Sequence, residues 1–167
     1  DKQVYTYYGI GKTGFNVVSC QFAIHYFFAN KSMLETFIQN VSEGCALNGY
    51  FIGTTYDGET LFEELENKKR GEGVSEFIGE HKIWEVKKAY DKEKFEANEL
   101  SLGMAIDVYQ ESINQTLTEY LVHFDYFKSL MADYGFTLLE RNEARDIGLP
   151  NSTGMFKELF QVMETEV

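Results

Sequence analysis

The chain has 167 residues, of which 44% are hydrophobic and 16% aromatic, and its net charge is −12. This length suits one domain with a sizeable core, and the apolar content excludes a disordered chain. The excess of acidic residues argues against binding along a long stretch of phosphate backbone, so any contact with RNA should be made to a few bases. No apolar run approaches the roughly 20 residues that span a bilayer, so no membrane role is expected.

The first motif along the chain is Gly9-Ile10-Gly11-Lys12-Thr13-Gly14, which matches G-x-G-x-x-G. Val4–Tyr8 could pass for the strand before it. Such a loop holds a nucleotide because its glycines open onto a helix N-terminus. Here a strand-like run follows, and the acidic residue expected about 20 positions later is missing. We therefore interpret the motif as an ordinary loop that enters a strand.

The first half of the chain then alternates between strands and helices. Four elements are predicted there: strands over 15–22 and 49–55, and helices over 32–43 and after a cap at Asp57. The helix over 32–43 should begin at a capping box formed by Ser32 and Glu35. This order predicts a doubly wound α/β domain.

The second half of the chain does not continue this alternation of strands and helices. Residues 66–80 are polar and contain glycine, and they predict a mobile loop. Residues 82–90 and 102–109 are predicted as two strands, so that 82–109 form a β-hairpin insertion. Trp84 and the lysines of 82–88 could touch RNA there, but a solvated face of the hairpin is favoured. The elements predicted beyond it are a helix over 117–134, a strand over 136–140 and a helical tail over 151–167.

The two cysteines, Cys20 and Cys45, are too few for a disulfide framework. Their surroundings also lack the Cys and His spacing of a zinc site. We expect two reduced thiols and no metal.

Three segments, in order along the chain, resemble the mRNA cap guanine-N7 methyltransferase family. Residues 21–26, Gln-Phe-Ala-Ile-His-Tyr, resemble its QF-x-x-HY segment. Residues 49–55 resemble its GGYFIGTT strand, with Asn48 in the place of the first glycine. Residues 118–122, Thr-Glu-Tyr-Leu-Val, resemble its PEFLV helix start. Three ordered matches are more specific than any one of them.

The resemblance implies a Rossmann-like, class I fold that depends on S-adenosylmethionine (SAM), with an inserted hairpin. It also implies methyl transfer from SAM to N7 of the cap guanosine. It places Gln21 and Phe22 beside the methyl donor at the end of a strand. Phe22, His25 and Tyr26 would wall the guanine pocket, and Glu119 would accept hydrogen bonds from guanine N1–H and the N2 amino group. N7 carries a free lone pair, so no general base is expected.

Physical chemistry agrees with these roles and leaves an alternative for each. Aromatic rings stack on the faces of a flat base, and a carboxylate recognises two neighbouring donors by accepting one hydrogen bond with each oxygen. His25, in its aromatic run, would also suit an ordinary core histidine. Glu119 would also suit the acidic partner of Thr116 in a helix capping box. Tyr56 stands where cellular members usually have a proline that contacts the cap, so it is a candidate wall of the pocket.

Residues 56–58 and 107–113 are similar to the large-DNA-virus branch of the family. This similarity implies a viral RNA-binding protein that acts on the mRNA 5′ cap, with the rest of a capping enzyme as its partner. Its expected location is intracellular, in the host cytoplasm (viral factory) or the nucleus.

The resemblance also places the family's glycine loop upstream of Asp1 and its final strand beyond Val167. We therefore expect residues 1–167 to be one partial methyltransferase domain that binds SAM weakly or not at all and is inactive alone. An uncovered sheet edge would also favour self-association. The alternatives are a non-catalytic methyltransferase-like subunit of a capping complex and a small-molecule methyltransferase, which His25, Tyr26 and Glu119 disfavour.

Overall fold

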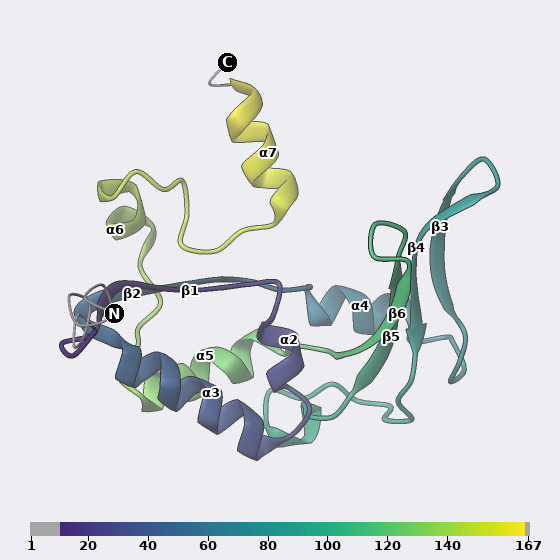
Figure 1. The fold of residues 1–167 in the computed structure, drawn as a ribbon, viewed down its shortest axis with the longest axis horizontal. Helices are drawn as coiled ribbons and strands as arrows, with labels where there is room; N and C mark the ends of the chain where they lie inside the picture. Colours follow the sequence, from purple (N-terminus) through teal and green to yellow (C-terminus); the bar gives the residue numbers. More distant parts are fainter. Residues whose placement is uncertain (1–10, 166–167) are drawn as a thin grey trace, which may run out of the picture. The chain divides into compact units, whose positions relative to one another are not determined.

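A computed structural model describes residues 11–165, and the chain divides into two compact units after Gly135 (Figure 1). The elements of the first unit are β1 (Phe15–Gln21), α2 (Ile24–Phe27), α3 (Lys31–Gly44), β2 (Cys45–Thr54), α4 (Gly58–Glu64), β3 (Gly73–Ile78), β4 (His81–Lys88), the 3-10 helix η1 (Glu99–Ser101), β5 (Ala105–Gln110), β6 (Gln115–Tyr120) and α5 (Phe124–Asp133). The second unit holds α6 (Arg141–Asp146) and α7 (Phe156–Thr165). The predicted α/β class is confirmed.

The glycine motif ends in a turn that runs into a strand, as predicted. The Gly14 amide donates to the Gly11 carbonyl at 3.0 Å, and β1 begins at the next residue. The first two residues of the motif and the candidate strand Val4–Tyr8 lie outside the described residues.

A parallel pair of strands, β1 and β2, is joined by α3. In this pair Val17 lies opposite Tyr50 and Gln21 lies opposite Thr54. Helices α3 and α5 lie on one side of the pair (Figure 1). On that side Phe51 of β2 contacts Phe37 of α3 and Phe127 of α5, each at a centroid distance of 6.2 Å. Successive strand residues point to opposite faces, so the other face carries side chains that stay exposed: Val17, Tyr50 and Ile52.

The start of α3 differs from its prediction. The helix begins at Lys31, and Asn30 is its cap, with its side-chain oxygen accepting from the Met33 amide at 3.0 Å. Asn30 lies two residues before Ser32, so the predicted capping box of Ser32 and Glu35 is wrong. Asparagine and serine are both favoured at the cap position. Asn30 is the cap because its backbone is extended, whereas Ser32 already lies within the helix.

A four-stranded antiparallel sheet, in the order β3-β4-β5-β6, forms the second layer of the first unit. Its strands β4 and β5 lie where two strands were predicted. The predicted loop over 66–80 is wrong at 73–78, because β3 pairs there with β4 and its backbone groups are satisfied by that neighbour. A core cluster holds one side of the sheet: Leu65, Val86, Tyr90, Met104, Ile106, Val108 and Leu121.

Residues 115–133 do not form the single helix predicted over 117–134. Residues 115–120 are strand β6, paired with β5, and α5 begins only at Phe124. The β-branched Thr116 and Thr118 suit a strand, and their alternation buries Glu119. The predicted strand over 136–140 is also wrong, since these residues have no regular structure.

The second unit is small. Glu140 and Glu143 form a reciprocal capping box at the start of α6. The helix predicted in the tail is confirmed as α7.

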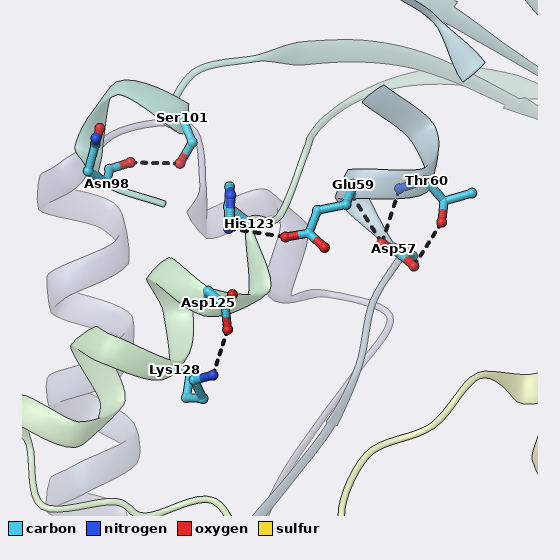
Figure 2. Close-up of polar contacts among 8 residues, drawn as sticks. All are labelled: Asp57, Glu59, Thr60, Asn98, Ser101, His123, Asp125 and Lys128. Carbon is cyan, nitrogen blue, oxygen red and sulfur yellow. Dashed lines mark hydrogen bonds and ion pairs between the residues drawn. The ribbon is translucent and has the colours of Figure 1, made fainter. Parts of the chain in front are cut away.

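The start of α4 is fixed from two sides. The Asp57 carboxylate accepts from the amides of Glu59 and Thr60 at 3.1 and 3.2 Å, as predicted for the cap of this helix (Figure 2). Gly58 follows, and a Cβ at this position would overlap the backbone of Val122, which lies just after β6. His123 Nδ1 lies 3.5 Å from the Glu59 carboxylate and connects the starts of α4 and α5 (Figure 2).

Replacing Asp57 with alanine should lower the free energy of unfolding by about 1 kcal/mol, because two amides lose their acceptor. Urea denaturation followed by circular dichroism measures this change. Lys128→Ala is the control: it removes an exposed ion pair with Asp125 and should leave the midpoint nearly unchanged. Equal midpoints for Asp57→Ala and the unaltered chain would contradict the role of the cap.

Candidate active site

The carboxyl end of β1 is held in an unusual backbone conformation. Phe22 has φ of 51°, in the left-handed region that favours glycine. Its amide donates to both the carbonyl and the hydroxyl oxygen of Thr54, at 3.1 and 2.9 Å. A phenylalanine here costs roughly 1–2 kcal/mol, and its ring remains 57% exposed. The site therefore keeps an aromatic ring at the strand end at a cost in stability.

Gln21 is the last residue of β1. Its side-chain amide donates to the Ser19 hydroxyl at 2.9 Å and is exposed. Gln21 and Phe22 thus lie together at the carboxyl end of a parallel strand, the edge at which ligands bind in open α/β sheets.

The short helix α2 brings His25 and Tyr26 against β6. The Tyr26 hydroxyl donates to Glu119 Oε1 at 3.1 Å, across 93 positions of sequence. His25 Nε2 lies 3.5 Å from Glu119 Oε2. Glu119 is only 5% exposed and His25 only 2%, whereas Tyr26 is 36% exposed. Three of the four residues predicted for the guanine pocket therefore come together, two from α2 and one from β6.

The alternative roles of Glu119 and His25 can now be weighed. Glu119 lies inside β6, so it is not the helix-capping partner of Thr116. His25 is buried like a core histidine, but neither of its ring nitrogens has a hydrogen bond within the described part of the chain. Glu119 Oε2 also lacks one. Buried polar atoms normally have partners, so this cluster is suited to a polar ligand.

Burial sets the protonation of this cluster. It lowers the pKa of His25 to about 4, so the ring is neutral near pH 7. It also raises the pKa of Glu119, and the hydrogen bond from Tyr26 offsets part of this rise. The 3.5 Å approach of His25 to Glu119 is therefore better described as a neutral imidazole beside a carboxylate than as an ion pair.

Tyr56 lies on the other side of His25. Their ring centroids are 5.3 Å apart. The Tyr56 hydroxyl accepts a hydrogen bond from Gln110 Nε2 at 2.9 Å, which ties this ring to β5. Neither Gln110 nor Thr54 was predicted as part of the site, because their roles depend on strand pairing that the local sequence does not reveal.

Within residues 11–165 we also looked for a metal site and for a membrane-spanning helix. Over residues 11–165, no three His, Cys, Asp or Glu side chains gather closely enough to hold a metal ion. The same range has no helix long and apolar enough to cross a bilayer. Cys20 and Cys45 are both free.

A parallel pair of strands joined by a helix, beside a second sheet, is typical of a Rossmann-like α/β protein. The profile of the mRNA (guanine-N(7))-methyltransferase domain matches residues 2–167. The chain belongs to this family of methyltransferases, and the predicted resemblance is confirmed.

Individual relatives agree with the family. A probable mRNA-capping enzyme of Acanthamoeba polyphaga mimivirus is 30% identical over 132 residues, which cover 75% of this chain and 11% of the relative. The mRNA cap guanine-N(7) methyltransferases of Candida glabrata and Caenorhabditis briggsae are each 30% identical, over 74% and 77% of this chain. The chain spans 30% and 32% of their lengths, so it corresponds to less than half of each relative.

Histidine NMR should show that His25 stays neutral from pH 7 to 5 and titrates with a midpoint of about 4. This folded-state pKa lies below the ordinary value of 6.5, so protonation favours the unfolded chain and His25 lowers stability as pH falls from 6.5 to 4. The His25→Asn variant assigns the resonance.

The same titration of Glu119→Gln separates two causes. If burial holds the pKa of His25 down, the midpoint stays low without the carboxylate. A midpoint above 6.5 in the unaltered chain that falls in this variant would instead establish an ion pair and contradict the neutral imidazole.

Proposed function

We propose that this chain forms the guanine-recognising part of an mRNA cap (guanine-N7) methyltransferase, which transfers a methyl group from SAM to N7 of the cap guanosine. The observation that carries this proposal is the buried Glu119 carboxylate, with one oxygen lacking a hydrogen bond, beside His25 and Tyr26. Membership of the family supports the reaction class.

Guanine recognition would centre on Glu119. Guanine presents two donors on one edge, N1–H and the N2 amino group, and a carboxylate accepts both in a bidentate arrangement. Tyr26 now donates to Oε1, so binding would move its hydroxyl aside and leave its ring against the base. The rings of Phe22, Tyr26 and Tyr56 and the neutral His25 would then contact the faces of the base, where stacking contributes roughly 1–3 kcal/mol.

Methyl transfer to N7 needs alignment more than proton transfer. SAM supplies an electrophilic methyl group when it is bound. Gln21 and Phe22 would lie beside it, at the carboxyl end of β1. This chain's residues would hold the lone pair of N7 in line with the transferred methyl, exclude water and favour the cationic product through the Glu119 carboxylate.

We also propose that the 167-residue chain does not complete this reaction alone. The glycines of the described residues 11–14 lead into β1 and not into a helix, so they do not provide a SAM loop. The remainder of a capping enzyme would supply it and cover the exposed face of Val17, Tyr50 and Ile52. In its absence that face favours self-association.

Glu119→Gln should weaken the binding of GTP or of the cap analogue GpppA about 10- to 100-fold, because the amide replaces one acceptor oxygen with an NH2 donor that faces a donor of the guanine edge. Isothermal titration calorimetry measures the affinities. Asp107→Asn, which changes a carboxylate on β5 bonded to Thr118, is the matched control and should change neither. In the unaltered chain, ITP, which lacks the N2 amino group, should bind more weakly than GTP. Equal affinities of the unaltered chain and Glu119→Gln would refute the recognition role.

A second titration addresses the cofactor. The chain alone should bind SAM weakly or not at all and should not methylate GpppA, whereas the parent protein should do both. Micromolar SAM binding with turnover by the chain alone would overturn the need for other segments. A parent protein that binds neither SAM nor cap would favour the alternative, a non-catalytic subunit of a capping complex.

A further inference from the structure

A cavity of 530 Å³ lies beside the candidate site, between α4 and the sheet. Its lining residues are Tyr56, Leu61, Ile83, Trp84, Val86, Val108, Gln110, Glu111 and Ser112. Trp84 pairs with Gln110, and Val86 with Val108, across β4 and β5. The floor of the cavity is thus built from two alternate residue pairs on one face of the sheet, and Trp84 is 38% exposed.

The lining has the chemistry of a nucleobase site. Trp84 and the aliphatic side chains offer flat, apolar contacts, and the polar groups of Gln110, Glu111 and Ser112 stand at one end. Among residues 11–165, no lysine or arginine lines it. The nearby Lys82 and Lys87 are paired with Glu85 at 3.0 and 3.1 Å. The cavity therefore suits an uncharged, aromatic group with a polar edge and disfavours phosphate.

Tyr56 lies between this cavity and the candidate guanine site, because its ring lines the cavity and also contacts His25. Its ring lies 5.3 Å from that of His25, and its hydroxyl is held by Gln110, which also lines the cavity. One ring thus borders both spaces. A capped RNA carries its first transcribed nucleoside on the 5′–5′ phosphate bridge, so a guanine held at Glu119 keeps this second base within reach of the neighbouring space.

We propose that the cavity binds the base of the first transcribed nucleotide, with Trp84 as its stacking surface and Tyr56 as the partition between the two bases. This inference rests on the proposed function, since the guanine anchors the ligand. The second base site gives a cap dinucleotide a contact that a guanine mononucleotide cannot make. It would let an acidic protein select capped RNA without binding the phosphate backbone.

The test uses the fact that Trp84 is the single tryptophan of the chain. GTP and GpppA are titrated into the 167-residue chain by calorimetry, and Trp84 emission is followed in parallel. GpppA should bind at least about fivefold more tightly than GTP and should quench Trp84, whereas GTP should leave the emission nearly unchanged.

Three variants localise the effect. Trp84→Leu should reduce the affinity for GpppA to that for GTP without changing GTP binding, and Trp84→Phe should keep most of the preference. Phe77→Leu, which changes another exposed ring of the same sheet, is the matched control and should behave as the unaltered chain. Comparing ratios between variants cancels the difference in charge between the two nucleotides.

Several results would overturn the inference while the proposed function stands. These are equal binding of GTP and GpppA with no quenching, a preference for GpppA that survives Trp84→Leu, or a loss of GTP binding in Trp84→Leu. If the unaltered chain binds neither nucleotide, the proposed function fails and the inference fails with it.

Discussion

The cost of taking a carboxylate out of water governs the arrangement of this protein. A buried charge that is not hydrogen-bonded is expensive, and in isolation it would become neutral or draw a partner to itself. Within the described residues, only one of the two carboxylate oxygens of Glu119 has a hydrogen bond, which the Tyr26 hydroxyl donates. His25, kept neutral by its own burial, does not supply the missing positive charge. The surrounding fold therefore maintains a buried acceptor with one oxygen unpaired among the described residues.

Two sheets of different kinds cooperate to hold that acceptor. The parallel pair ends at Phe22, whose strained backbone turns the chain into α2 and delivers His25 and Tyr26. The antiparallel sheet delivers Glu119 from β6 and fixes Tyr56 through Gln110 on β5. Each sheet alone provides only part of the candidate site, so the site depends on how the two sheets are packed together.

The sequence predicted the elements that depend on their own residue pattern. It missed the strands that form only because a neighbouring strand pairs with them. The strand over 15–22 and the helix over 32–43 were predicted from their local sequence, and they form as β1 and α3. Tyr120 and Leu121 fit the helical spacing of the residues that follow them, and only pairing with β5 makes 115–120 a strand. β3 was missed for the same reason. For the site, the residues were found through family motifs, because no local pattern links Tyr26 to a side chain 93 positions away.

Gly58 shows how far the requirements of the site extend. It is the first residue of α4, where almost any other residue would be a better helix former, yet a Cβ there would collide with the Val122 backbone. A larger side chain would wedge the helix away from the end of β6 and carry the adjoining Tyr56 away from Glu119. Substitution at this position would thus disturb the candidate site from outside it, and helix propensity would be a misleading guide to which residues the position tolerates.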